Sequence, residues 1–246
     1  MPHPEEDRDP PGVRRVRAPN PSPLTLDGTN TYVVGGWVVD PGPNDEGHLR
    51  AVSQAAEGSI EGIVLTHSHA DHSAGAGPLS EREGGVPVLL PQGGQDIGPF
   101  RVLATPGHAP DHVSLVTAEG VCFVGDVVMG VGSVFIDPGE GSLAAYLDSL
   151  RRLRGLDLSV LCPGHGPYVW DPRAKLDEYV AHRLERERLL LAALRAGARR
   201  EEELLDRAWS DAPAALRPAA ALSLRSHLRK LADEGRLPGG LEEDLV

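Results

Sequence analysis

The chain has 246 residues, with 24 lysines and arginines against 36 aspartates and glutamates, and a formal net charge of −12. Its length is sufficient for one large domain and a smaller second one. Residues 1–172 hold 10 basic and 22 acidic residues, whereas residues 173–246 hold 14 of each. This balance argues against a protein that binds nucleic acid mainly through phosphate contacts.

The first twelve residues, 1–12, are charged and proline-rich without an apolar run. We predict a mobile tail there and no export signal. No later stretch is apolar enough to predict a membrane span. Cys122 and Cys162 each lie in an apolar strand, which favours buried reduced thiols and a cytoplasmic location.

Short apolar stretches alternate along the chain with segments of helical periodicity. The predicted strands are Val13–Arg17, Thr31–Val34, Trp37–Asp40, Gly62–Thr66, Val86–Leu90, Phe100–Thr105, Val113–Thr117, Val121–Gly125 and Val160–Cys162. The predicted helices are Glu46–Ala56, His72–Leu79, Leu143–Arg154 and Arg173–Ala196. This order predicts an α+β or α/β domain over residues 13–172 and a helical domain over residues 173–246.

The densest group of potential metal ligands directly follows the apolar run Ile63-Val64-Leu65. His67, His69, Asp71 and His72 fall within six residues, in the pattern His-x-His-x-Asp-His. Imidazole nitrogens bind borderline divalent ions, and a carboxylate adds an anionic oxygen ligand. The alternative is a polar loop that happens to be rich in histidine. The density of ligands favours a metal site.

Three further ligand residues each occupy a glycine-flanked turn after an apolar stretch. They are His108 after Pro106-Gly107, Asp126 after Gly125, and His165 within Pro163-Gly164-His165-Gly166-Pro167. Glycine tolerates unusual backbone angles, so a strand can end abruptly and present one ligand. Three turns of the same design favour a single shared site.

These seven residues together resemble the metallo-β-lactamase superfamily, whose pattern is His-x-His-x-Asp-His followed by a distant His, Asp and His. The resemblance implies an αββα sandwich, in the α+β class. It also implies two metal ions, one held by His67, His69 and His108 and the other by Asp71, His72 and His165, with Asp126 bridging them.

Two divalent cations about 3.5 to 4 Å apart can share a hydroxide, lower its pKa and polarise the oxygen under attack. We therefore predict a dinuclear hydrolase that contains zinc, with manganese or iron as alternatives. Asp71 is expected to be a metal ligand, and it could also orient the hydroxide or carry its proton as a catalytic residue.

Further stretches resemble the beta-lactamase-like protein 2 group, which is related to glyoxalase II. They are Asn20–Tyr32, Val39–Pro43, Pro163–Pro167, Tyr179–Arg183 and Glu185–Glu187. That group adds a small winged-helix-like C-terminal domain, and its animal mitochondrial member cleaves single-stranded RNA. Here Leu224, Leu228 and Leu231 recur at helical spacing, and Asp233–Arg236 resembles the turn into the wing. This domain would contact nucleic acid, cover the active-site rim or form a homodimer.

Three other residues are candidates for supporting roles. Asp40 precedes Pro41-Gly42 and would either orient a metal ligand or stabilise a turn. His112 lies four residues after His108 and would hydrogen-bond either a ligand or an ordinary loop. His182 lies in Tyr179–Arg183, one of the stretches that resemble the beta-lactamase-like protein 2 group, and the resemblance implies a position near the substrate entrance. Packing or exposure explains this histidine equally well.

The substrate is the least determined property. The first hypothesis is single-stranded RNA, for which the basic surface would come from Arg183, Arg186, Arg188, Arg225, Arg229, Lys230 and Arg236. The second is a small ester or thioester, as in glyoxalase II-like enzymes or acyl-thioester hydrolases. A third class is a mononuclear iron persulfide dioxygenase, which carries the same His-x-His-x-Asp-His stretch. Because every expected ligand precedes residue 166, deletion of residues 197–246 is predicted to change substrate preference more than metal content.

Overall fold

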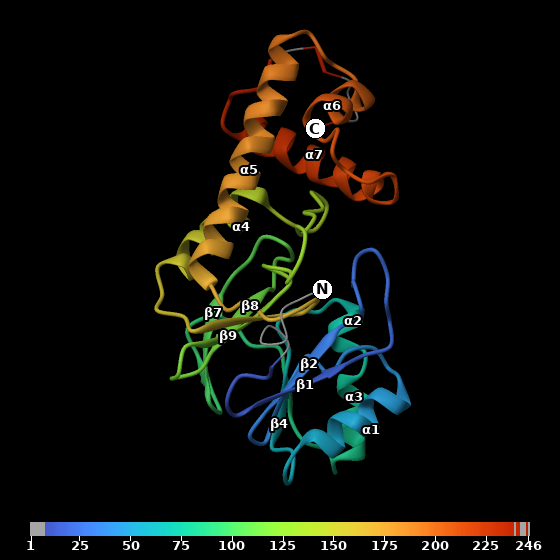
Figure 1. The fold of residues 1–246 in the computed structure, drawn as a ribbon, viewed down its shortest axis with the longest axis vertical. Coiled ribbons are helices and arrows are strands. Elements are labelled where there is room, and N and C mark those ends of the chain that lie inside the picture. The colour runs from blue at the N-terminus through green and yellow to red at the C-terminus, as the bar shows by residue number, and fades with distance from the viewer. Residues whose placement is uncertain (1–7, 239, 242–244, 246) are drawn as a thin grey trace.

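The computed structural model describes residues 8–238, 240–241 and 245 (Figure 1). Residues 1–7 of the predicted tail lie outside this part of the chain. Residues 9 and 10 of the predicted tail contact the domain. The side chain of Asp9 accepts a hydrogen bond of 2.7 Å from the Tyr168 hydroxyl, and the carbonyl of Pro10 accepts one of 3.0 Å from the amide of Val13.

Two five-stranded sheets form the first domain. The first sheet has the order β1 (Val13–Arg17), β2 (Asn30–Val34), β3 (Trp37–Val39), β4 (Gly62–Val64) and β5 (Val88–Leu89). The second has the order β10 (Val160–Pro163), β9 (Val121–Gly125), β8 (Val113–Val116), β7 (Phe100–Ala104) and β6 (Asp96–Ile97). Tyr32 and Val64 of the first sheet pack in one buried cluster with Leu115 and Phe123 of the second, so the two sheets share a core.

Helices cover the outer face of each sheet. On the first sheet these are α1 (Glu46–Ala55) and α3 (Ala76–Arg82), and on the second α4 (Leu143–Arg154) and the start of α5 (Pro172–Arg195). Asp45, Ser142 and Asp171 cap α1, α4 and α5 by accepting backbone amide hydrogen bonds, and Pro172 fits the first turn. The layers confirm the predicted αββα sandwich.

The C-terminal region is a small helical domain. Helix α6 (Glu201–Ala208), the 3₁₀ turn η1 (Ala214–Leu216) and α7 (Arg217–Asp233) follow α5. Leu190 and Leu194 of α5 pack against Leu224 and Leu228 of α7, so the predicted leucine stripe is buried. Figure 1 shows α5 running from the sandwich to this domain. Within the described part of the chain no residue after α7 forms a strand, so the wing that Asp233–Arg236 suggested is a turn and coil there.

Each predicted strand is present, with ends shifted by up to two residues, and the helices at 46–56, 143–154 and 173–196 are present with ends shifted by at most one residue. The predicted helix His72–Leu79 was wrong as a single element, because it divides into α2 (Ala70–Ser73) and α3. At the division, a Cβ on Gly75 would lie 2.9 Å from the carbonyl oxygen of Pro41, so the chain there needs glycine. Strand β6 and helix α6 were not predicted.

No helix among the described residues has the length and apolar character needed to cross a membrane. Cys122 and Cys162 are both buried and free of disulfides.

Candidate metal centre

The seven candidate ligands gather at one end of the two sheets. His67 follows β4, and His69, Asp71 and His72 lie at the start of the short helix α2. The other three follow strands of the second sheet, namely His108 after β7, Asp126 at the end of β9 and His165 after β10. Residues far apart in the sequence therefore meet because their strands end at the same edge.

The ligand atoms form three overlapping groups, each with its atoms within 4.8 Å of one another. They are His67, His69 and His108; His67, His72 and Asp126; and Asp71, His72 and His165. The first and third groups coincide with the two sets expected from the sequence. The carboxylate of Asp126 lies between them, 3.4 Å from Nε2 of His72 and 3.6 Å from Nε2 of His108.

Glycines allow this close approach. A Cβ on Gly164 would lie 2.5 Å from the ring of His72 and 2.6 Å from Oδ1 of Asp126. Gly125 has a φ of +46°, and a Cβ there would lie 2.6 Å from Nε2 of His112. Larger residues at these two turns would therefore displace the site.

Hydrogen bonds fix the tautomer of each candidate histidine ligand. Nδ1 of His108 lies 3.3 Å from the carbonyl oxygen of Phe135, and Nδ1 of His165 lies 3.4 Å from that of Gly28. Carbonyl oxygens only accept, so both Nδ1 atoms carry a proton, and in the neutral ring Nε2 is the atom left to bind a cation.

The remaining three imidazoles follow the same rule. Nδ1 of His72 donates to Asp40 (2.9 Å), and Nε2 of His69 donates to Glu140 (3.2 Å). Nδ1 of His67 lies 3.0 Å from the Thr66 hydroxyl oxygen, whose own proton goes to Asp40, so His67 is the donor.

The consequence is a set of lone pairs that face one another. Nε2 of His108 lies only 3.1 Å from Nδ1 of His69. Three buried atoms, Nε2 of His67, Nε2 of His72 and Oδ1 of Asp126, have no hydrogen-bond partner. Buried acceptors without donors are costly, and either a proton on a ring nitrogen or a cation at their centre removes the cost. The donor set of imidazole nitrogens and carboxylate oxygens fits divalent zinc, manganese or iron.

Protons compete with cations for part of this site. Burial opposes the charged form of His165, but the carboxylate of Asp126 outweighs it and raises the pKa of His165 to about 9. Burial also opposes the charged form of His72, but the carboxylates of Asp126 and Asp40 outweigh it and raise the pKa of His72 well above the usual range. Burial, reinforced by neighbouring imidazoles, instead lowers the pKa values of His67 and His108.

The carboxylates of the site are held in their ionised form. Burial disfavours the charge on Asp126, yet His165 and His72 lower its pKa well below the usual range. For Asp71, burial is likewise outweighed by His165 and His72, and the pKa of Asp71 is lowered. Nε2 of His165 lies 3.3 Å from Oδ2 of Asp71.

Asp40 and His112 form hydrogen bonds with candidate ligands without belonging to the ligand set. The two carboxylate oxygens of Asp40 accept hydrogen bonds from the amide and hydroxyl of Thr66 as well as from His72. Nε2 of His112 accepts from the backbone amide of Asp126 (3.1 Å). Burial lowers the pKa of His112 to about 3, so this ring stays neutral and able to accept.

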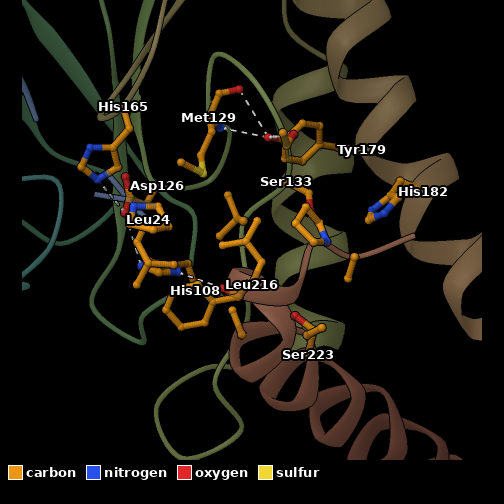
Figure 2. A pocket seen from close by; sticks show the side chains of 18 of the residues that line it. Leu24, His108, Asp126, Met129, Ser133, His165, Tyr179, His182, Leu216 and Ser223 are labelled. Carbon is orange, nitrogen blue, oxygen red and sulfur yellow. Dashed lines mark hydrogen bonds and ion pairs between the residues drawn. The ribbon is translucent and has the colours of Figure 1, made fainter. Parts of the chain in front are cut away.

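A cavity of about 760 Å³ opens from these ligands toward the C-terminal domain. Figure 2 shows His108, Asp126 and His165 at one side and His182 at the other, with Met129 and Leu216 between them. The lining is mainly apolar and aromatic: Leu24, Met129, Val134, Phe135, Tyr179, Trp209, Leu216, Ala219 and Ala220. His182 therefore lies on the cavity wall, with Nε2 accepting from Arg186 (3.2 Å).

The basic residues that the sequence suggested for phosphate contacts are already bonded within the chain. Arg186 pairs with Asp211, Arg188 with Glu185, and Arg225 with Glu201, while Lys230 and Arg236 share Glu187 and Glu234. Arg183 and Arg229 donate to backbone carbonyls, and Arg183 is only 2% exposed. These contacts reduce the number of donors that the seven side chains could offer to phosphate groups.

Sequence reasoning missed Thr66, Glu140 and the carbonyl of Phe135, although each contacts a candidate ligand. Thr66 adjoins His67 and could have been suspected from that position. A backbone carbonyl leaves no trace in a sequence pattern, and Glu140 has no motif around it.

Known proteins share this architecture. The sequence profile of the Metallo-beta-lactamase superfamily matches residues 24–93 and 82–165, and that of the Beta-lactamase associated winged helix domain matches residues 201–237. The chain is 31% identical over 257 residues to the Beta-lactamase-like protein 2 homolog of Caenorhabditis elegans, covering 91% of this chain and 85% of that one.

It is also 34% identical over 227 residues to the Atrochrysone carboxyl ACP thioesterase of Aspergillus chevalieri, covering 79% of this chain and 69% of that one. Among solved structures, a Beta-lactamase domain protein from Burkholderia ambifaria superimposes with a TM-score of 0.80 at 22% identity, covering 97% and 91% of the two chains.

Proposed function

Since this chain belongs to the metallo-beta-lactamase superfamily and is a hydrolase of that fold, we propose that it cleaves acyl thioesters with two divalent cations. The proposed ligands are His67, His69 and His108 for one cation, Asp71, His72 and His165 for the other, and Asp126 for both. Bound there, the cations would act as Lewis acids and make water a nucleophile near neutral pH.

The chain itself contributes to this reaction in two ways. Hydrogen bonds at Nδ1 orient the rings of His72, His108 and His165 toward the centre, so these rings need not rotate when a cation binds. Asp71, whose lowered pKa keeps it ionised, can accept a proton from the attacking water. The C–S bond breaks as the new C–O bond forms, and the products are a carboxylic acid and a thiol.

The cavity is the observation that supports a thioester most strongly. Its mainly apolar wall offers burial to an acyl chain whose carbonyl lies at the ligand end. The relative from Aspergillus chevalieri is named a thioesterase, which supports the same class. Single-stranded RNA is less favoured because five of the seven basic side chains expected to contact phosphate are paired with carboxylates of the chain, and Arg183 is buried.

The test is a parallel assay of the metal-loaded protein. The substrates are N-acetylcysteamine thioesters of increasing acyl length, a single-stranded oligonucleotide and, with oxygen uptake as the readout, a glutathione persulfide. We expect thioester turnover whose kcat/KM rises with acyl length and changes little with salt. Oligonucleotide cleavage without thioester turnover would overturn the proposal in favour of RNA, and oxygen uptake with one iron per chain would favour the dioxygenase.

A further inference from the structure

Residues 134–140 lie between the candidate ligands and the C-terminal domain, as coil over 134–137 and as a turn over 138–140. We call this stretch the 134–140 loop. On one side, side chains of α5 and α7 donate to every second carbonyl. Arg183 bonds the carbonyl of Val134, Ser226 that of Ile136 (2.7 Å), and Arg229 that of Pro138 (2.8 Å).

The opposite side of the loop holds the candidate ligands. The carbonyl oxygen of Phe135 accepts from Nδ1 of His108 at 3.3 Å, and the carboxylate of Glu140 accepts from Nε2 of His69 at 3.2 Å. Just beyond the loop, the amide of Ser142 donates to the carbonyl of Gly107 (2.9 Å), so the turn that carries His108 is tied to it as well.

The orientation of the Phe135 carbonyl is thus restricted by the peptide groups on both sides of it. Rotation of its peptide group requires compensating changes in the two adjacent peptide groups, whose carbonyls are held by Arg183 and Ser226. Ile136 is fully buried in the core under the second sheet, which fixes the position of the loop but leaves the direction of the carbonyls to the hydrogen bonds.

We infer that Ser226 and Arg229 are positioning residues for the metal centre, acting through the 134–140 loop on His108 and His69. The C-terminal domain would then be part of the metal site's support as well as a wall of the cavity. The inference rests on the proposed ligand roles of His69 and His108, and it is independent of which substrate the enzyme cleaves.

Ser226 allows a matched test, because threonine and valine have the same shape and differ in the hydroxyl group alone. Ser226→Thr and Ser226→Val are compared with the parent chain, together with Arg229→Met. The control is Arg225→Met, on the same helix, since Arg225 pairs with Glu201 and does not touch the loop. Metal-free protein is titrated with Zn²⁺ against a chromophoric chelator, while NMR follows the imidazole N–H proton of His108. Circular dichroism verifies the fold of each variant.

We expect Ser226→Val to bind one of two zinc ions about tenfold more weakly than Ser226→Thr does, in the range seen for supporting contacts of metal ligands. The His108 N–H signal should shift in Ser226→Val and in Arg229→Met, and stay in place in Arg225→Met.

Equal zinc affinities for the threonine and valine variants, with an unchanged His108 signal, would overturn the inference and leave the proposed function intact. Equal weakening of both zinc ions would also overturn it, because the hydroxyl would then support the fold in general. A parent chain that binds no zinc would overturn the inference and the proposed function together.

Discussion

Oδ2 of Asp40 lies 2.9 Å from Nδ1 of His72, and Asp40 reaches it with a φ of +49°. This left-handed conformation places the carboxylate directly after β3, where it also accepts the amide and hydroxyl protons of Thr66. Asparagine tolerates the same backbone conformation, so Asp40→Asn changes the side-chain chemistry while keeping the turn.

We expect Asp40→Asn to weaken binding of one metal ion by about 10- to 100-fold, because His72 loses the acceptor that fixes its tautomer. Competition titration with Zn²⁺ checks this, and circular dichroism checks the fold. Unchanged affinity would show that His72 needs no such support.

Asp126→Ala should reduce the metal content from about two ions per chain to one or fewer, and should lower turnover at least about 100-fold. The reason is that Asp126 is the carboxylate whose oxygens approach His72, His108 and His165 together. Elemental analysis and an activity assay provide the measurement. Asp96→Ala, at an exposed position on β6, is the matched control and should retain both metal content and activity.

Metal-free protein should lose thermal stability as the pH rises from about 6.5 to about 9. The pKa of His165 is raised to about 9 in the folded chain, so its protonated form stabilises the fold fully below the unfolded value and no longer does so above 9. His72, with its raised pKa, acts in the same direction. Melting temperatures in the presence of a chelator test this, and His165→Gln should flatten the dependence.

Metal affinity should show the opposite trend over the same window, because a cation must displace the proton from His165. We expect zinc affinity to rise with pH toward about 9, by up to tenfold per pH unit for each proton displaced. Titrations at several pH values in weakly coordinating buffer provide the measurement. An affinity independent of pH would contradict the assignment of His165 as a ligand.

Leu216→Trp should reduce kcat/KM for long-chain thioesters by at least about tenfold and leave acetyl thioesters nearly unchanged. Leu216 lies on the cavity wall (Figure 2), and the larger ring would fill space that a long acyl chain requires. Leu184→Trp, the same substitution at an exposed position of α5 outside the cavity, is the control. Equal effects on short and long chains would argue that the acyl group binds elsewhere.

The fold could be predicted to the extent that local sequence determines it. Val121–Gly125 and Leu143–Arg154 have the bounds expected from β-branched content and helical periodicity. Strand β6 has only two residues, too few to produce a period. At the break, the amide of Gly75 donates to the carbonyl of Gly42 (2.9 Å), a contact that no pattern within the segment reveals.

The candidate site, too, could be predicted from the sequence only in part. The seven candidate ligands belong to a motif and could be identified from the sequence, whereas their support comes from distant parts of the chain. Glu140 contacts His69 across 71 positions. The sequence also predicted that deleting residues 197–246 would change substrate preference more than metal content. The bonds of Ser226 and Arg229 to the 134–140 loop argue that the metal content would change as well.

Helix α5 has 24 residues and contributes Tyr179 to the core of the sandwich and Leu190 to that of the C-terminal domain. At 1.5 Å per residue it is a continuous rod about 36 Å long. Because one uninterrupted helix belongs to both cores, the two domains have no hinge within α5 itself. Acyl-chain selectivity should therefore be tuned one side chain at a time, and engineering it needs no change in how the domains are joined.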